Sequence, residues 1–270
     1  MTHQAHPALT RTQWVLAPAG SPAPVVACLP HGGRDFPAEL GGDLVVRPDS
    51  LWADWLTREL YAFLPEVGIT TVTTAFSRFV ADVNRDPASG HGGFWNTVVS
   101  AKQPNGRPLY RRELTPAEVA GRIRLAHEPF HQALDDVIAG LLQLFPRVLL
   151  LDLHSFGRPH PGDVVLGDRH GLTARPEAVG LVSGALAGQG FDVRLNQRLI
   201  GGWTVQRFTG DDRVDAIQVE LAQRSYLNLR ARQGRPGPPP AGEFAATSAR
   251  LREVLAAGVA TPLLAQYQPR

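Results

Sequence analysis

The chain has 270 residues, of which 43% are hydrophobic and 19% charged, and its formal net charge is +2. This composition is typical of a globular protein, and so small a net charge gives no electrostatic basis for binding nucleic acid or a membrane surface. The single cysteine, Cys28, excludes an intrachain disulfide and a zinc site built from several cysteines. We expect a cytoplasmic protein without a signal peptide or a membrane-spanning segment.

The first clear element is a strand at Val25–Leu29, which follows an irregular, proline-containing start over residues 1–24. Five consecutive apolar residues are typical of a strand that is buried on both faces of a parallel sheet. The strand runs directly into a Pro-His-Gly-Gly loop around His31, where the glycines let the backbone approach a ligand closely. His31 is therefore a candidate ligand at a strand end.

A helix is predicted to begin near Leu51, because apolar residues recur there at helical spacing. They are Trp52, Trp55, Leu56, Leu60, Phe63 and Leu64. This helix would carry Asp54 in its first turn, where a carboxylate either ligates a metal or simply stabilises the helix N-terminus. The sequence pattern leaves these two roles equally open.

The next segments combine arginines with turn residues. A strand is expected at 70–74, and a short strand at 77–86 that ends in the turn Asp-Val-Asn-Arg-Asp. Arg78 and Arg85 lie in this stretch, and an arginine there can hold a substrate carboxylate through two parallel hydrogen bonds. Residues 88–114 are rich in glycine and proline and too long for an ordinary connection, which predicts an active-site loop or lid.

A long helix is predicted from the capping box at 115–118 to Phe145, with a kink at Pro129. Residues 127–131 read His-Glu-Pro-Phe-His and satisfy the H-E-x-x-H pattern of zinc proteases. Proline inside the pair removes a backbone hydrogen bond and distorts the spacing on which that motif depends. We therefore disfavour a zincin site and expect the two histidines to pack or to support other residues.

The most informative strand is expected at 148–153, where an unbroken apolar run leads into the sequence Asp-Leu-His-Ser around His154. Side chains at the C-terminal ends of buried parallel strands are where α/β enzymes place their chemistry. His31 and His154 end two such strands, which suggests a shared metal. A catalytic zinc takes three protein ligands and keeps one position for water, and Asp54 is the candidate for the third ligand.

Another strand is expected at 217–221 and contains Glu220. A glutamate in an apolar strand is costly unless it is paired or functional, and it can take the proton of an attacking water in a metal-assisted hydrolysis. The simpler alternative is a solvent-facing glutamate on an edge strand. Upstream, Arg207 follows a Gly-Gly pair and is a further candidate for a substrate carboxylate. Strands alternate with helices throughout, which predicts one α/β domain over residues 1–270.

Six short motifs occur in the order seen in the N-formylglutamate amidohydrolases, and the chain resembles this family from about residue 25 to residue 230. The motifs are Pro30-His31-Gly32-Gly33 with Pro37, Asp54-Trp55, Ser77-Arg78 through Asp82-Val83-Asn84-Arg85, Asp152-Leu153-His154-Ser155, Gly201-Gly202 with Arg207, and Val219-Glu220-Leu221-Ala222-Gln223-Arg224. The resemblance implies a three-layer α/β sandwich, similar to the zinc carboxypeptidases, in which a mixed, twisted sheet lies between helices.

The resemblance also implies the residues of the site. One metal ion, Zn²⁺ or another divalent cation, would be held by His31, Asp54 and His154. Glu220 would act as the base and then as the acid. The residues implied for substrate binding are Arg85, Asn84, Arg78 and Arg207.

The reaction implied is the hydrolysis of N-formyl-L-glutamate, a small anionic substrate, to formate and L-glutamate in histidine degradation. Residues 90–107 lack the Gly-Gln-Asn and threonine-rich stretch of the histidine-degrading enzyme, which leaves open another N-acyl or N-formyl amino acid, or a small carboxypeptidase-type amide. A non-catalytic metal-binding domain is a third alternative. Glu220 argues against it, because a binding module needs no general base.

Overall fold

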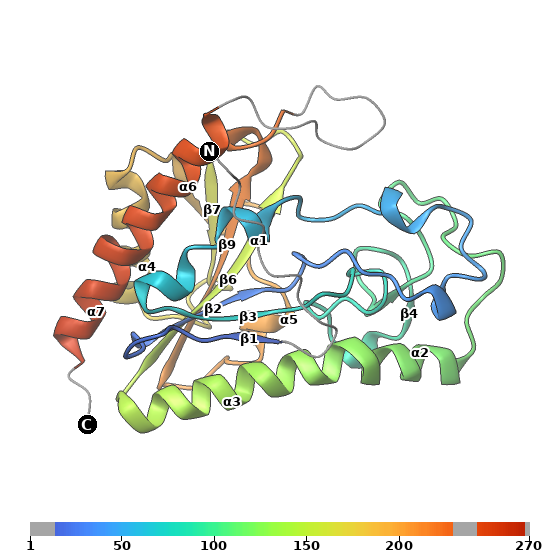
Figure 1. Cartoon of the computed structure of the whole chain (residues 1–270), viewed down its shortest axis with the longest axis horizontal. Helices are drawn as coiled ribbons and strands as arrows, with labels where there is room; N and C mark the ends of the chain where they lie inside the picture. Colours follow the sequence, from blue (N-terminus) through green and yellow to red (C-terminus); the bar gives the residue numbers. More distant parts are fainter. Residues whose placement is uncertain (1–13, 229–241, 268–270) are drawn as a thin grey trace.

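The computed structural model describes residues 14–228 and 242–267, and its centre is a seven-stranded sheet (Figure 1). In chain order the strands are β1 (Val15–Leu16), β2 (Val25–Leu29), β3 (Thr70–Thr73), β6 (Val148–Phe156), β7 (Val164–Gly167), β8 (Val193–Leu195) and β9 (Val214–Ala222). Their order across the sheet is β1-β3-β2-β6-β9-β7-β8. The four central strands β3, β2, β6 and β9 are parallel, whereas β1 and β7 pair antiparallel with β3 and β9, so the sheet is mixed.

Helices cover both faces of the sheet, as the strand pattern requires. The helices are α1 (Thr57–Leu60), α2 (Pro116–Arg122), α3 (Glu128–Leu144), α4 (Pro176–Gly188), α5 (Trp203–Gln206), α6 (Glu243–Glu253) and α7 (Thr261–Gln266). Leu149 and Leu151 of β6 pack in one apolar cluster with α1, α4, α6 and α7, whereas Leu150 packs in another with α3 and α5. This alternation follows from the two-residue period of a strand. The predicted three-layer α/β arrangement is confirmed.

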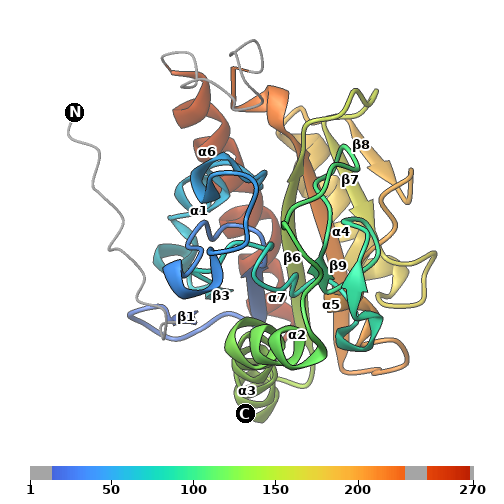
Figure 2. The same ribbon diagram turned by 90° about the vertical axis from the view of Figure 1, so that its right-hand side faces the viewer.

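The predicted long helix is confirmed with one local change. Thr115 and Glu118 form the expected capping box at its start. Instead of a simple kink at Pro129, a π turn at Ile123–His127 joins α2 to α3. Proline cannot donate a backbone hydrogen bond, and the wide turn just before it takes up the mismatch without ending the helix. In Figure 2, α2 and α3 are seen nearly end-on and in line with each other.

The helix predicted from Leu51 is wrong over its first part. The α-helix begins only at Thr57, because Leu56 has a φ of 58°, in the left-handed region that a helix cannot pass through, and it ends at Leu60, before the predicted residues Phe63 and Leu64. Asp54 therefore lies in the loop before α1 and not in a helix. The short strand predicted at 77–86 is also wrong. That segment consists of turns, in which Ser77 Oγ accepts a hydrogen bond from the amide of Phe79 at 3.3 Å.

Long loops form a lobe beside the carboxyl ends of the central strands, on the right of Figure 1. The lobe has its own apolar cluster, which includes Phe36, Phe79, Phe94 and Leu109. The predicted 88–114 loop belongs to it and contains the short strands β4 (His91–Gly92) and β5 (Val99–Ser100). This packing gives the loops fixed positions from which side chains reach the ends of β2 and β6.

Of the predicted irregular start, residues 1–13 lie outside the described residues, and β1 occupies part of the remainder. The assignment of residues 1–270 to a single domain stays a prediction. No helix in the described ranges is long and apolar enough to cross a membrane.

Candidate metal centre and active site

The pairing of β6 with β9 places His154 beside Glu220. The two strands are parallel and in register over nine residues, and the partners include Asp152 with Gln218 and His154 with Glu220. Side chains two residues apart share a face of the sheet, so all four point toward the α3 side near the carboxyl ends of the strands. All four are buried. The sheet itself therefore assembles this part of the site.

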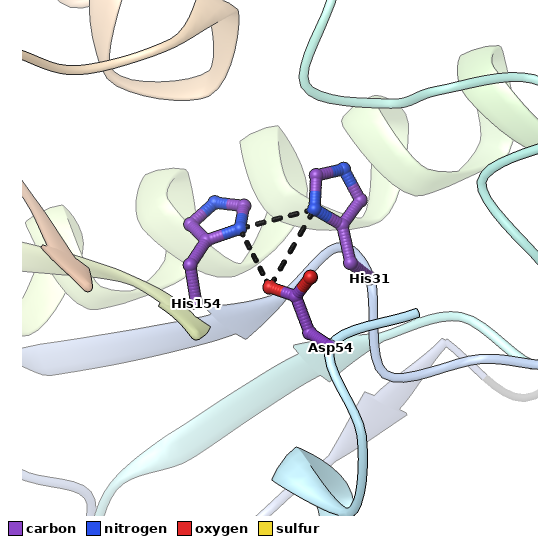
Figure 3. A group of neighbouring side chains, drawn as sticks. All are labelled: His31, Asp54 and His154. Atoms are coloured by element: carbon purple, nitrogen blue, oxygen red, sulfur yellow. Dashed lines mark hydrogen bonds and ion pairs between the residues drawn. The ribbon is translucent and has the colours of Figure 1, made fainter. Parts of the chain in front are cut away.

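His31, Asp54 and His154 converge, although they come from three separate parts of the chain (Figure 3). His31 follows β2, Asp54 lies before α1, and His154 lies in β6. The two Nδ1 atoms are 3.1 Å apart, and Asp54 Oδ2 lies 3.3 Å from Nδ1 of His154 and 3.7 Å from Nδ1 of His31. Each side chain is less than 5% exposed. Asp54 is also anchored to the sheet, because Oδ2 accepts a hydrogen bond from the amide of Ser155 at 2.9 Å.

The hydrogen bonds around the three residues fit a cation. His31 Nε2 donates to Asp82 Oδ1 at 2.7 Å, which leaves a lone pair on Nδ1. Asp152 Oδ2 lies 3.0 Å from Nε2 of His154, and this carboxylate favours positive charge on the imidazole. Two Nδ1 lone pairs so close together repel each other unless a proton or a cation lies between them. Asp54 Oδ1, moreover, is buried without a hydrogen-bond partner. Two imidazoles and a carboxylate form a donor set that suits zinc.

The electrostatics of the site lead to the same conclusion. Burial by itself would lower the pKa of His154, but the carboxylates of Asp152, Asp54 and Glu220 outweigh burial and hold this pKa well above its usual value. Burial would raise the pKa of Asp54, but hydrogen bonds with His154 and His31 hold it below its usual range. The surroundings therefore favour positive charge at this point, which a divalent cation supplies.

The carboxyl group of Glu220 is suited to proton transfer. It is 8% exposed and lies in β9, next to His154 in the strand pairing. Burial raises the pKa of Glu220 to about 7, with a further rise from Asp54 and Asp152 that His154 and Arg78 oppose. A carboxyl group with such a pKa accepts and returns a proton at neutral pH. The burial of Glu220 also removes the alternative of a solvent-facing residue.

The three converging residues and Glu220 line a cavity of about 640 Å³. Its walls include the aromatic residues Trp52, Trp95, Phe156 and Trp203 and the arginines Arg78, Arg85, Arg158 and Arg198. Ser89, Trp95 and Asn96 come from the 88–114 loop, in line with its predicted place at the active site. Aromatic side chains together with convergent polar and charged groups suit a small polar ligand.

The expected substrate-binding arginines lie in different environments. Arg85 lines the cavity, and its Nε and Nη1 donate to the carbonyl oxygens of Trp95 and Asn84 at 3.0 and 2.8 Å. These bonds orient the guanidinium and leave Nη2 for a ligand. Arg78 also lines the cavity but is buried and paired with Asp82. Since this pairing already compensates its charge, Arg85 is the better candidate for a substrate carboxylate.

Arg207 does not line this cavity. Its Nη1 donates to Nδ1 of His131 at 2.7 Å, and its Nη2 donates to Asp135 Oδ2 at 2.6 Å. This placement does not support the substrate-binding role expected for Arg207, because its guanidinium is held by residues of α3.

Asn84 lines the cavity next to a presumed metal ligand. Its Nδ2 lies 3.1 Å from Nε2 of His154, and its Oδ1 accepts a hydrogen bond from the amide of Thr204 at 2.9 Å. The amide thus joins His154 to the first turn of α5. A side chain at Gly202 would overlap this amide, which explains one glycine of the Gly-Gly pair.

The structure adds four residues to the site that the sequence patterns did not predict. Asp82 and Asp152 hold the outer nitrogens of His31 and His154, and the signal for Asp152 is its place two residues before His154 on the same face of a strand. Arg158 and Arg198 lie on loops after β6 and β8 and line the cavity, and among the described residues neither has an acidic partner. Arg158 lies over the Trp95 ring at 4.5 Å. No local pattern distinguishes these two from other loop arginines.

The H-E-x-x-H histidines are engaged elsewhere. His127 Nε2 lies 2.9 Å from the carbonyl oxygen of Arg85, and His131 Nε2 lies 2.8 Å from that of Val83. Within the described ranges, the group able to hold a metal is formed by His31, Asp54 and His154 and does not include them. The structure therefore gives no support to a zincin site.

Comparison with known proteins decides the family. The sequence profile of the N-formylglutamate amidohydrolase family matches residues 23–227. The chain belongs to this family. N-formylglutamate deformylases of Pseudomonas aeruginosa and Pseudomonas putida are each 30% identical to it, over 86% and 76% of this chain and 91% and 82% of their own lengths.

Solved structures agree with this assignment. The crystal structure of an N-formylglutamate amidohydrolase from Ralstonia eutropha is similar at a TM-score of 0.79 with 29% identity, and the match covers 93% of this chain and 98% of that one. A gene product of Agrobacterium tumefaciens shares the fold at a TM-score of 0.69 with 19% identity over 93% of this chain and 96% of that one. The N-formylglutamate amidohydrolase fold therefore extends over nearly the whole chain.

Replacement of His154 by alanine is expected to weaken zinc binding at least about tenfold, because a three-ligand site loses one ligand. Zinc retained after dialysis against a chelator, measured by mass spectrometry, checks this. His160→Ala is the matched control, because His160 lines the cavity outside the ligand set and its loss should leave the zinc content unchanged. Full zinc retention by His154→Ala would show that the metal is held elsewhere.

Proposed function

We propose that this chain catalyses the metal-dependent hydrolysis of N-formyl-L-glutamate to formate and L-glutamate, as a step of histidine degradation. The observation that carries the proposal is the position of Glu220, a buried base with a pKa near 7, beside the His31–Asp54–His154 group in one cavity. Membership of the N-formylglutamate amidohydrolase family supports the choice of substrate. Zinc is the metal that we favour.

A divalent cation held by His31, Asp54 and His154 supplies a Lewis acid and lowers the pKa of water at the site. Glu220 accepts the proton of the water that attacks the formyl carbon. As the C–N bond breaks, the same carboxyl group returns a proton to the leaving amine. Cleavage gives formic acid and the neutral amine, and transfer of the formic acid proton to the amine yields formate and the ammonium form of glutamate, with Glu220 again ionised for the next turnover.

Asp82 keeps His31 in the form that this chemistry needs. Burial alone would raise the pKa of Asp82, but Arg78, His31 and Arg85 hold it well below its usual range. Asp82 therefore stays ionised and accepts the Nε2–H of His31, so that Nδ1 keeps its lone pair. Arg78 thus contributes to the site by compensating the buried negative charge of Asp82.

The cavity arginines suit a substrate with two carboxylates. Arg85 is oriented by two backbone carbonyl groups, and Arg158 and Arg198 are free of acidic partners among the described residues. Arginine binds carboxylates through paired donors, and such charged hydrogen bonds contribute more than neutral ones. We propose that Arg85 binds one carboxylate of N-formylglutamate, and that Arg158 or Arg198 binds the other.

A second candidate keeps the chemistry and changes the acyl group. A cavity of about 640 Å³ has more room than a formyl group requires, which favours a larger N-acyl amino acid as an alternative substrate. A non-catalytic metal-binding domain is disfavoured. Burial of the Glu220 carboxyl group is unfavourable, and a domain that only binds a metal does not need a buried general base.

Formate or acetate release from N-formylglutamate, N-formylaspartate and N-acetylglutamate tests the choice of substrate. We expect the highest kcat/KM for N-formylglutamate, and about a 10- to 100-fold higher KM in Arg85→Met, because a charged hydrogen-bond pair is lost. Arg213→Met, at an exposed arginine paired with Asp211, should leave KM unchanged. A preference for N-acetylglutamate would shift the proposal to the larger acyl group.

Glu220→Gln is expected to lower kcat about 10²- to 10⁴-fold while zinc content is retained, since the amide cannot accept the proton of water. Steady-state kinetics and metal analysis of the same preparation check this. The exposed Glu253→Gln serves as control and should keep full activity. Nearly intact hydrolysis by Glu220→Gln would refute this mechanism.

The pH profile should show an ascending limb that belongs to Glu220. Without metal its pKa is about 7, and a nearby dication favours the ionised form and lowers that value. Because the ionised form is the base, kcat/KM should rise with pH through a pKa below about 7 and then level off. Profiles of wild type and of the residual activity of Glu220→Gln check the assignment. A limb that persists unchanged in the variant would belong to another group.

A further inference from the structure

The two histidines of the H-E-x-x-H pattern lie against the turn formed by residues 82–85, which carries Arg85. We propose that His127, His131 and Arg207 form a clamp that fixes the backbone of this turn and thereby the position of Arg85 in the cavity. The part of this inference that concerns substrate binding rests on the proposed function. All three members are positioning residues, since none of them lines the cavity.

The clamp holds the turn at two carbonyl groups. His131 Nε2 bonds the carbonyl oxygen of Val83 at 2.8 Å, and His127 Nε2 bonds that of Arg85 at 2.9 Å. A carbonyl oxygen only accepts, so both Nε2 atoms carry hydrogen and donate. The two bonds lie on either side of Asn84, the residue that contacts His154. The spacing of four residues, which in a zincin brings two imidazoles to one metal, here brings them to one turn.

Arg207 determines which ring nitrogen of His131 carries the hydrogen. A guanidinium group can only donate, so His131 Nδ1 must accept from Arg207 Nη1 at 2.7 Å. The hydrogen of the neutral ring is then on Nε2, where the carbonyl oxygen of Val83 needs it. Burial, and after it the charges of His127 and Arg207, lower the pKa of His131 to about 3, so the ring is neutral near pH 7. Asp135 holds the other end of Arg207 through Nη2 at 2.6 Å.

The position of Arg85 in the cavity depends on the backbone of the turn. Its Nη1 donates to the carbonyl oxygen of Asn84, so the guanidinium moves with the backbone of the turn. The same turn carries Asp82, which holds His31. A shift of the turn would therefore misplace the substrate contact, and small misplacements of a binding group are costly in enzymes. The α3 side of the molecule thus controls a residue in the cavity without touching the substrate.

Two measurements on the zinc-loaded full chain test the clamp. Nitrogen-15 NMR of the His131 ring near pH 7 should show a protonated Nε2 and an unprotonated Nδ1. Arg207→Met should raise the KM for N-formylglutamate about three- to tenfold, the equivalent of one hydrogen bond, with kcat and zinc content almost unchanged. Arg207→Lys, which keeps a donor, should restore much of this loss. Arg213→Met is the matched control and should match wild type.

His131→Phe should raise KM to a similar extent, and the double variant with Arg207→Met should be no worse than either single one, because both act through the same contact. If His131→Phe does not fold, Arg207→Met carries the test, since it leaves the ring in place. A protonated Nδ1, or additive effects of the two substitutions, would overturn the clamp. A raised KM in Arg207→Met beside an unchanged KM in His131→Phe would also overturn it and would make Arg207 a direct substrate contact.

The failure of the clamp and the failure of the proposed function are distinguishable. Absence of N-formylglutamate hydrolysis by the wild type would refute the proposed function. The NMR signals of His131 would still decide whether Arg207 and Val83 hold the ring as proposed.

Discussion

The uninterrupted parallel register of β6 and β9 is the constraint on which the active site depends. It places His154 beside Glu220 on the α3 face of the sheet. A slip of one residue would turn either side chain to the opposite face and separate His154 from Glu220. The register is strongly specified, because both strands are buried on both faces and their apolar residues fill two different clusters. The core that stabilises the fold therefore also positions His154 and Glu220.

Burying so many ionisable groups requires that their charges be compensated, and the way in which this happens indicates their roles. Asp82 is compensated by Arg78 and His31, and Asp152 faces His154 and accepts a hydrogen bond from the Cys28 thiol at 3.2 Å. Asp54 keeps one buried oxygen without a partner, which a cation would satisfy. Glu220 instead has its pKa raised to about 7, the condition in which it can exchange protons. The environment of Asp54 thus suits metal binding, and that of Glu220 suits proton transfer.

The H-E-x-x-H pattern shows that residue spacing alone does not identify a site. Pro129 and the π turn before it place His127 and His131 against backbone carbonyl groups, and no carboxylate or third imidazole joins them among the described residues. What a pair of histidines four residues apart binds depends on which groups the fold places opposite the two rings. Here that partner is the turn that supplies Asp82, Asn84 and Arg85 to the active site.

The sequence by itself determined the α/β class, the central strands and the places of His31 and His154 near their carboxyl ends, because apolar runs depend on local burial and backbone preference. It also carried the family motifs. The resemblance implied Asp54 as a ligand, whereas its place in space is set by the tertiary structure, since Leu56 interrupts the expected helix and the loop brings Asp54 to Ser155 beside the two histidines. The tertiary structure likewise places Arg85 in the cavity wall and Arg207 outside it, because the two arginines differ in what packs against them. These contacts join residues more than 40 positions apart, and they form only when the strands and loops pack together.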